Sequence, residues 1–549
     1  MKRSVLAFFV LMSLGLTLAP AFARDDKAER DKLLDAAPAG ITAASATLAD
    51  VLKQHETAIG RRPGLLETRK EVWSRSDFGL AGSERLFRRG LDYLAHIERG
   101  PFVEEYGQLE GRHWHRVANG NVYLMTTEDY DSFAMFRVVE DAADPKNDAK
   151  LLGEVAGPKP AYVVEVRRAG SKHPEWIFYD KTSGLIVRTE ASVNRRRLAG
   201  DYDDYRTTNG YTEAWHVHDS IAELGLDNDY KRTSLNVGEP IESATFAAPA
   251  GAFAPGAFEK PGPVAGKITN ETVVIRLTVN GRGLDFELSA GAPVSLIDRD
   301  VARELNLPSF GQMTQTKDGK NFGYDTEIAE ARVGETTVLH HLALRVVNFN
   351  YNAGYGTKIV GLLGSDFLQS GIFKVDFVHG RIDVVTAADL GDDKMKGAYY
   401  IPLTIDDGLP LTTGTIGGHS IENMVIDFQW PVSFVLAPFT DQYPEAVPDA
   451  RPGKSRRKAV VPFADSASYG REVDVWPSNV PDFRFSTAHF VSLPVIATND
   501  SSPYDHDVDA IVGFDILWYF DVYLDFANRQ MYLKPNTNFT SRFKVVTPK

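Results

Sequence analysis

Two short segments place chemically active side chains at matched positions. Residues 288–295 read LSAGAPVS and residues 426–433 read IDFQWPVS, so Ser289 in the first segment corresponds to Asp427 in the second. A carboxylate can act as a general base, whereas a serine hydroxyl becomes a nucleophile only beside a base. No Gly-x-Ser-x-Gly turn surrounds Ser289, and no histidine stands beside it in the sequence. The pair offers one ionisable group and one alcohol at equivalent positions.

Both segments belong to an internal repeat. Residues 362–385 (LLGSDFLQSGIFKVDFVHGRIDVV) align without gaps to residues 511–534 (IVGFDILWYFDVYLDFANRQMYLK), and Gly364 matches Gly513. A repeat of this length indicates a duplicated structural unit. We therefore predict two all-β units, one over residues 268–390 and the other over residues 398–549.

The order of elements in each unit resembles that of the retropepsin-like aspartic peptidases. Lobes of that family carry Leu-Asp-Thr-Gly-Ala and, later in the chain, Ile/Leu-Leu-Gly, to which LSAGAPVSLID (288–298) and VGLLGSDFL (360–368) correspond. The resemblance implies two β-barrel lobes that form a pseudo-symmetric bilobed unit. It also implies a cleft between the lobes that is shaped for an extended peptide.

The resemblance further implies that each lobe supplies one aspartate of a catalytic dyad. The dyad shares one proton, because like charges about 3 Å apart cannot both ionise. In the first lobe Ser289 replaces that aspartate and Ala290 replaces the following threonine, whereas Gly291 and Ala292 are retained. The first lobe has kept the small residues of the loop and lost the acid.

The second lobe shows the opposite change. Asp427 is retained, but Phe428, Gln429 and Trp430 replace the threonine, the glycine and a small residue. We expect a defective dyad, with Asp427 at the retained position and Ser289 at the substituted position. Pairing of two chains through two Asp427 residues is an alternative that the bulky loop disfavours. The residues predicted to contact a substrate are Ala290, Gly291, Ala292, Phe428, Gln429 and Trp430.

Other acidic residues and the histidine pairs have simpler interpretations. Asp298 precedes a short apolar-periodic segment and is predicted to cap a helix. Capping and turn roles also explain the aspartates that recur in the repeat, which are Asp366, Asp376, Asp515 and Asp525. His113 with His115, and His216 with His218, would each share one face of a strand and could contribute two imidazoles to a metal. No third ligand is recognisable near either pair, and we predict no metal and no cofactor.

The N-terminal part, residues 24–246, has a different pattern. A helix is predicted within residues 45–60, ending at Gly60, and alternating apolar and polar residues then predict a long series of strands. This order, with FYDKTSGLIVRTE (178–190) and ATFAAP (244–249), resembles the carrier domain of the lipoprotein-sorting family, an open β-barrel wrapped around helices. The resemblance implies a concave face for acyl chains. A Pro/Gly/Ala-rich linker is predicted over residues 247–267.

The first 23 residues and the composition bear on location and partners. Lys2 and Arg3, an apolar run and Ala21-Phe22-Ala23 are typical of a cleavable signal, which predicts export to the periplasm without a transmembrane anchor in the mature chain. The chain lacks cysteine and therefore has no disulfides. Its formal net charge of −14 argues against nucleic acid as a partner, although residues 451–458 are basic and are interpreted as a solvated loop.

Taken together, the sequence predicts a mainly β protein with an open β-barrel-like domain followed by two retropepsin-like lobes. The predicted function is binding of a peptide or protein in the inter-lobe cleft without cleavage. Two alternatives stay open. One is an active aspartic endopeptidase that uses Asp427 and a second acid that the sequence does not identify. The other is handling of a lipid or lipoprotein by the N-terminal domain.

Overall fold

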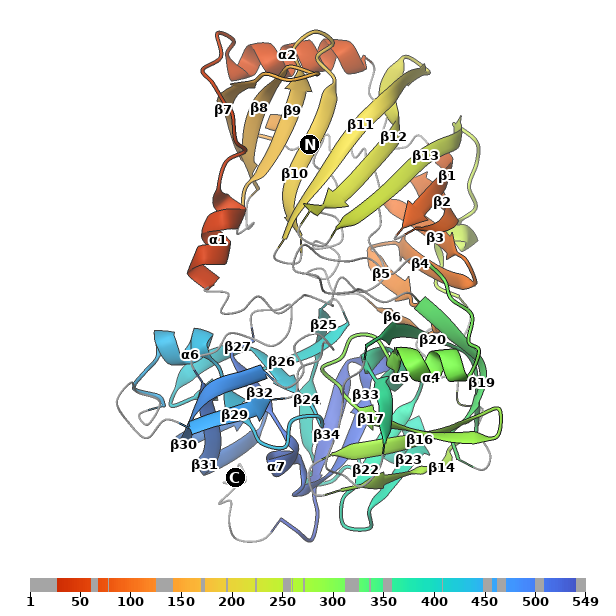
Figure 1. Cartoon of the computed structure of the whole chain (residues 1–549), viewed down its shortest axis with the longest axis vertical. Helices are drawn as coiled ribbons and strands as arrows, with labels where there is room; N and C mark the ends of the chain where they lie inside the picture. Colours follow the sequence, from red (N-terminus) through yellow and green to blue (C-terminus); the bar gives the residue numbers. More distant parts are fainter. Residues whose placement is uncertain are drawn as a thin grey trace.

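The computed structural model describes most of the chain. The described residues are 27–60, 68–77, 79–124, 142–168, 173–193, 196–222, 225–249, 258, 260–269, 272–311, 325–334, 337–348, 358–406, 408–447, 457–461, 471–498 and 508–539. The predicted mainly β fold class is confirmed (Figure 1). The predicted signal peptide lies outside the described residues. No helix in these ranges is both long and apolar enough to cross a membrane.

The N-terminal part is built on one antiparallel meander. Its sheet has the order β6-β5-β4-β3-β2-β1-β13-β12-β11-β10-β9-β8-β7. Strands that follow one another in the chain are paired, except β6 and β7, which form the two edges, and β1 also pairs with β13. The strands are β1 (Arg69–Asp77), β2 (Leu80–Arg89), β3 (Asp92–Arg99), β4 (Phe102–Leu109), β5 (Arg112–Arg116), β6 (Val122–Leu124), β7 (Asp148–Val155), β8 (Ala161–Arg167), β9 (Glu175–Asp180), β10 (Ile186–Val193), β11 (Arg196–Thr208), β12 (Tyr211–Ile221) and β13 (Leu226–Val237).

Two helices precede this sheet, α1 (Lys27–Asp35) and α2 (Leu48–Ile59), and a 3-10 turn, η4 (Ser243–Phe246), follows it. The second helix is the predicted one. Thr47 and Asp50 form a capping box at its start, and Gly60 caps its end. Its buried residues Val51 and Ile59 pack on the sheet.

Each repeat unit folds around its own sheet. The first contains β15 (Gly266–Ile268), β16 (Val273–Val279), β17 (Arg282–Leu288), β18 (Leu296–Asp298), β19 (Asp325–Arg332), β20 (Val338–Val347) and β21 (Ile359–Leu363), with helix α4 (Arg299–Glu304). The second contains β25 (Thr404–Asp406), β26 (Leu409–Ile416), β27 (His419–Ile426), β28 (Phe434–Val435), β29 (Arg457–Val461), β30 (Arg471–Phe485), β31 (Ala488–Thr498) and β32 (Ala510–Val512), with helix α6 (Ala437–Gln442).

A six-stranded sheet joins the two units, in the order β14-β23-β22-β33-β34-β24. Its members are β14 (Gly262–Val264), β22 (Ile372–Asp376), β23 (Arg381–Val385), β24 (Tyr399–Pro402), β33 (Phe520–Asp525) and β34 (Gln530–Pro535). Short helices α5 (Ser365–Leu368) and α7 (Phe514–Leu517) lead into β22 and β33, and the 3-10 turns are η5 (Ala387–Leu390) and η6 (Phe526–Asn528). Strand β14 comes from the stretch interpreted as linker, where Val264 is buried in the core.

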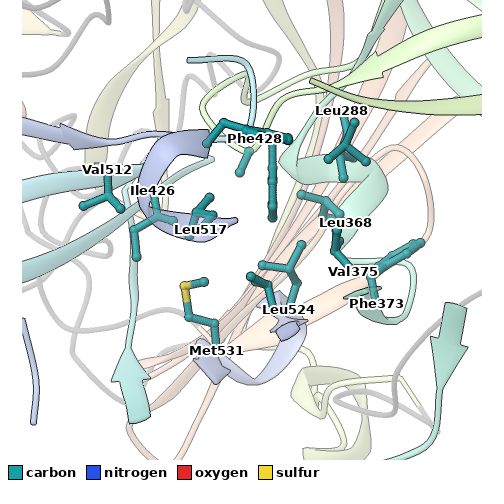
Figure 2. Packing of buried hydrophobic residues seen from close by; sticks show 14 of the residues in the cluster. Leu288, Leu368, Phe373, Val375, Ile426, Phe428, Val512, Leu517, Leu524 and Met531 are labelled. Carbon is teal, nitrogen blue, oxygen red and sulfur yellow. The ribbon is translucent and has the colours of Figure 1, made fainter. Parts of the chain in front are cut away.

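One hydrophobic core extends across this junction. Leu288 and Phe373 from the first unit share a cluster with Leu524 and Met531 from the second, as Figure 2 shows. Pairing of β22 with β33 places Val375 opposite Val522 at the centre of the junction. Because burial of apolar area stabilises the contact between the units, they form a single body.

The cap of α4 gives a testable local prediction. Asp298 accepts hydrogen bonds from the backbone N–H groups of Asp300 (3.0 Å) and Val301 (3.2 Å), as expected of a helix N-cap. We expect Asp298→Ala to lower the free energy of unfolding by about 1 kcal/mol. Urea unfolding would measure the loss, with the exposed Asp300→Ala as control. An equal loss in the control would contradict the capping role.

Candidate functional site

Ser289 and Asp427 occupy the same place in their units. Ser289 directly follows β17, which runs parallel to β21, and its N–H donates to the Leu363 carbonyl at 3.0 Å. Asp427 directly follows β27, which runs parallel to β32, and its N–H donates to the Val512 carbonyl at 3.0 Å. The matched hydrogen bonds bring the ends of the two strands together.

The two side chains meet across the units. Ser289 Oγ donates to Asp427 Oδ2 at 3.2 Å, and both residues are 0% exposed. One hydroxyl and one carboxyl group therefore meet at equivalent positions of the two units. A hydroxyl cannot ionise near neutral pH, so these two groups do not share a proton as two carboxyls do.

Gln429 completes a polar cluster around Ser289. Its Oε1 lies 3.1 Å from Ser289 Oγ, and its backbone N–H donates to Asp427 Oδ1 at 3.2 Å. The single hydroxyl hydrogen cannot bond fully to both acceptors. Nε2 of Gln429 is buried, with no hydrogen-bond partner in the described part of the chain. If Oε1 and Nε2 of Gln429 are exchanged by rotating its side-chain amide, Nε2 donates to Ser289 Oγ and the Ser289 hydroxyl donates to Asp427.

A second buried acid, Glu287, lies beside this cluster. It stands on β17, two residues before Ser289, and it accepts a hydrogen bond from Thr272 Oγ1. Burial raises the pKa of Glu287 to about 8, the Thr272 hydroxyl opposes this shift, and the charge of Asp427 adds to it. Glu287 is not among the residues predicted from the sequence, and no local signal marks it, because the end of β17 shows no alternation of buried and exposed residues.

The recurring Pro-Val-Ser segments fix the loops that follow. Ser295 Oγ donates to Asp366 Oδ1 at 2.7 Å and accepts from the Gly364 N–H at 3.0 Å. In the second unit Ser433 Oγ donates to an aspartate, Asp515, at 2.7 Å and accepts from a glycine, Gly513, at 2.9 Å. Each serine therefore ties its loop to the segment that follows β21 or β32.

The two glycines allow backbones to cross at this point. A Cβ atom added at Gly364 would lie 2.3 Å from the Ala292 carbonyl oxygen. One added at Gly513 would lie 2.6 Å from the carbonyl oxygens of Trp430 and Val432. Only a residue without a side chain permits this approach, which explains why the glycine spacing is repeated.

The residues predicted to contact a substrate are buried. Phe428 belongs to the core shared by both units, as Figure 2 shows, and Trp430 packs edge-on against Phe434 at 5.0 Å between ring centroids. Gln429 is 1% exposed, and Ala290 and Ala292 also belong to core clusters. These side chains shape the loops. Contact between the loops, including Gly291, and a substrate stays a prediction.

The aspartates of the repeat have several roles. Asp376 accepts from the His379 N–H at 3.0 Å, which confirms its turn role, and Asp525 accepts from Asn528 Nδ2 at 2.9 Å. Asp366 and Asp515 lie in the first turns of α5 and α7, but the capping role predicted for them is wrong, because Gly364 and Gly513 are the N-caps and no side chain caps either helix. Their carboxylates bind the loop serines instead. Sequence spacing could not show this contact.

The histidine pairs face acids and aromatic rings. His216 lies between Asp203 (2.6 Å) and Asp229 (2.5 Å), and His115 stacks on Tyr106 at 3.9 Å between ring centroids. Among the described residues, no group of three or more histidines, cysteines, aspartates or glutamates is placed to hold a metal ion.

The buried face of the N-terminal sheet is charged. Arg69 bonds Glu213 at 2.7 Å, and Arg75 bonds both Asp77 (2.7 Å) and Glu84 (3.0 Å). On β1, Arg69, Arg75 and Asp77 lie on the same buried face as Trp73. Trp73 packs with Ile59 of α2. Burial raises the pKa of Glu84 to about 8. Guanidinium and carboxylate groups thus occupy part of the face on which α2 packs.

Comparisons with known proteins match both parts of the chain. Residues 275–367 match the family model of the aspartyl protease, which confirms the resemblance predicted for the first unit. No curated protein sequence matches the chain significantly.

Solved structures similar to the chain fall into two groups. The N-terminal part is similar to a DUF1329 family protein from Desulfovibrio piger (15% identity, 36% of this chain and 95% of that one, TM-score 0.28) and to a LolA superfamily protein from Nitrosomonas europaea (10%, 37% and 99%, 0.27). An aspartic proteinase from Irpex lacteus is similar to another part of the chain (13% identity, 51% of this chain and 99% of that one, TM-score 0.31).

Proposed function

We propose that this chain is an exported, periplasmic protein whose two aspartic-peptidase-like lobes bind a peptide or protein segment without hydrolysing it. The observation that carries the proposal is the contact of Ser289 Oγ with Asp427 Oδ2 at 3.2 Å. Hydrolysis by this architecture uses one ionised and one protonated carboxyl group, and a serine supplies neither role near neutral pH.

Burial of the pair supports the same proposal. Ser289 and Asp427 are surrounded by core residues such as Phe428, so an attacking water and a substrate carbonyl have no direct access to them in this conformation. Peptide binding depends on other features of the lobes, namely sheet edges and side-chain pockets, which do not need the dyad.

The N-terminal domain is not assigned a lipid ligand in this proposal. An acyl chain gains free energy by contact with apolar surface, whereas the buried face of β1 carries Arg69, Glu71, Arg75 and Asp77. Separating Arg75 from Asp77 and Glu84 to admit an apolar chain would leave buried charges unpaired, at a large cost in free energy.

A cleavage and binding assay tests the proposal. Purified mature protein is incubated with denatured casein from acid to neutral pH, with and without pepstatin, and compared with Asp427→Asn. We expect no pepstatin-sensitive cleavage by either protein, and binding of fluorescent casein peptides, followed by anisotropy, to be retained by both. Pepstatin-sensitive cleavage that disappears in Asp427→Asn would overturn the proposal, and so would a lack of peptide binding.

The second candidate function is an active aspartic endopeptidase, and Glu287 is the observation that favours it. Burial raises the pKa of Glu287 and the charge of Asp427 adds to this, so two acids interact in the same buried region. If Glu287 supplied the missing carboxyl group, Glu287→Gln would abolish cleavage as completely as Asp427→Asn does. Including this variant in the same assay separates the two candidates.

A further inference from the structure

A hairpin turn of the N-terminal domain contacts the first lobe directly. The turn between β5 and β6 is closed by hydrogen bonds from the Val117 N–H to the Asn121 carbonyl (2.9 Å) and from the Gly120 N–H to the Val117 carbonyl (2.7 Å). Asn121 Nδ2 donates to Ser370 Oγ at 3.0 Å and to the Asp366 carbonyl at 3.3 Å. Asn121 and Ser370 are buried, so this contact excludes water.

Both polar atoms of the Asn119 side-chain amide form hydrogen bonds in the same interface. Its Oδ1 accepts from the Ala343 N–H of β20 at 2.7 Å, and its Nδ2 donates to Asp366 Oδ2 at 3.1 Å. Nearby, Phe102 of β4 packs edge-on against Phe310 at 5.4 Å between ring centroids. Because β20 and α5 both contact Asn119, the turn is held in one orientation against the lobe.

Asp366 links this interface to the candidate site. Besides Asn119, its carboxylate accepts from the Ser295 N–H (3.0 Å), from Ser295 Oγ (2.7 Å) and from the Phe367 N–H (2.8 Å). Ser295 in turn holds Gly364, and the Ser365 N–H donates to the Ala292 carbonyl at 2.7 Å. Ala292 lies three residues after Ser289. A short series of hydrogen bonds therefore connects the N-terminal domain with the loop that carries Ser289.

The second lobe provides a natural comparison. Its equivalent aspartate, Asp515, accepts from Ser433 Oγ, from the Ser433 N–H and from the Ile516 N–H, all within its own lobe. In the described part of the chain, the N-terminal domain supplies a donor to the aspartate of the first lobe. The pseudo-symmetry of the repeat is broken at this contact.

We propose that Asn119 is a positioning residue through which the N-terminal domain fixes the Ser289 loop. Its amide donates to a partly buried carboxylate whose other donors are Ser295 and the Phe367 N–H of its own helix. Charge-assisted hydrogen bonds of this kind are stronger than neutral ones, and losing one destabilises the charged state that holds Ser295. The N-terminal domain is then a structural part of the site, beyond the binding function proposed above.

Amide hydrogen exchange on the full mature chain tests the inference without any ligand. We expect Asn119→Ala to speed exchange about tenfold in peptides covering residues 289–296 and 364–368, while peptides covering residues 427–435 and 513–517 stay unchanged. Asn121→Ala is the matched control, because it removes a contact of the same turn that does not reach the carboxylate. It should speed exchange at residues 366–370 and leave Ser295 protected.

A double-substitution cycle separates positioning from general loosening of the interface. If Asn119 acts through the carboxylate, then Asn119→Ala adds little further exchange at Ser295 once Asp366→Asn is present. The inference is overturned if the two effects add fully, if both asparagine variants act equally on Ser295, or if exchange rises equally in both lobes. None of these outcomes depends on peptide binding, so a failure here is distinct from a failure of the proposed function.

Discussion

Replacing Glu287 with glutamine is expected to make the protein more stable in alkaline solution. The folded-state pKa of Glu287 is about 8, raised mainly by burial, whereas an unfolded glutamate has an ordinary pKa of about 4.3. The folded state therefore binds a proton more tightly than the unfolded state does. Stability from this group is fully present below about pH 4.3 and is lost as pH rises through the interval to about pH 8.

Glutamine cannot ionise, so the variant should not show this loss. We expect the difference in free energy of unfolding between Glu287→Gln and the natural chain to grow with pH, reaching roughly 3–5 kcal/mol at pH 9. Urea unfolding from pH 4 to pH 9 measures it. Glu239→Gln, at an exposed ion pair with Lys70, should give a nearly constant difference. A flat difference for Glu287→Gln would show that its carboxyl ionises freely in the folded protein.

The repeat allowed much of the two lobes to be predicted from the sequence. Gly364 and Gly513 are needed because a side chain at either position would clash with a backbone carbonyl, and glycine therefore recurs at the same position of the repeat. Strand periodicity and the cap at Asp298 are likewise local signals. The meeting of Ser289 with Asp427 follows from applying these signals to both copies of the unit.

The sequence could not show which way the bulky residues after Asp427 point. Both side chains, Phe428 and Trp430, are buried in this structure, and their predicted contact with a substrate stays a prediction. At the end of a strand the regular alternation stops, so the face that a side chain takes is decided by long-range packing. Here that packing includes Phe377, whose ring centroid lies 6.3 Å from that of Phe428.

Charge alternation in the N-terminal strands was similarly ambiguous. The segment RKEVWSRSD of β1 indicates a strand, but its charged residues Arg69, Glu71 and Arg75 lie on the buried face. A reader of the sequence would expect charges to face water. Ion pairs explain the burial, and their partners include Asp77 on the same strand, Glu84 on β2 and Glu213 on β12, the last of which is distant in the chain.

Replacing Ser289 with aspartate is expected to destabilise the protein strongly at neutral pH. In Ser289→Asp a carboxylate replaces the hydroxyl that now lies 3.2 Å from Asp427 Oδ2, in a position that is 0% exposed. Two carboxylates at such a distance cannot both ionise without a large cost, so one pKa of the pair should rise well above that of an ordinary aspartate. As worked out for Glu287, a raised carboxyl pKa means that stability is lost as pH increases.

The matched control is Ser289→Asn, which has nearly the shape of aspartate but no charge. Any strain from the larger side chain affects both variants at every pH, so only the difference between them reports the charge. We expect the two variants to be equally stable near pH 3, where carboxyl groups are protonated, and Ser289→Asp to be less stable by roughly 3–5 kcal/mol at pH 8. Urea unfolding across this range measures the difference. Equal stability at pH 8 would mean that residue 289 does not lie against the Asp427 carboxylate in solution, and the contact on which the proposed function rests would be lost with it.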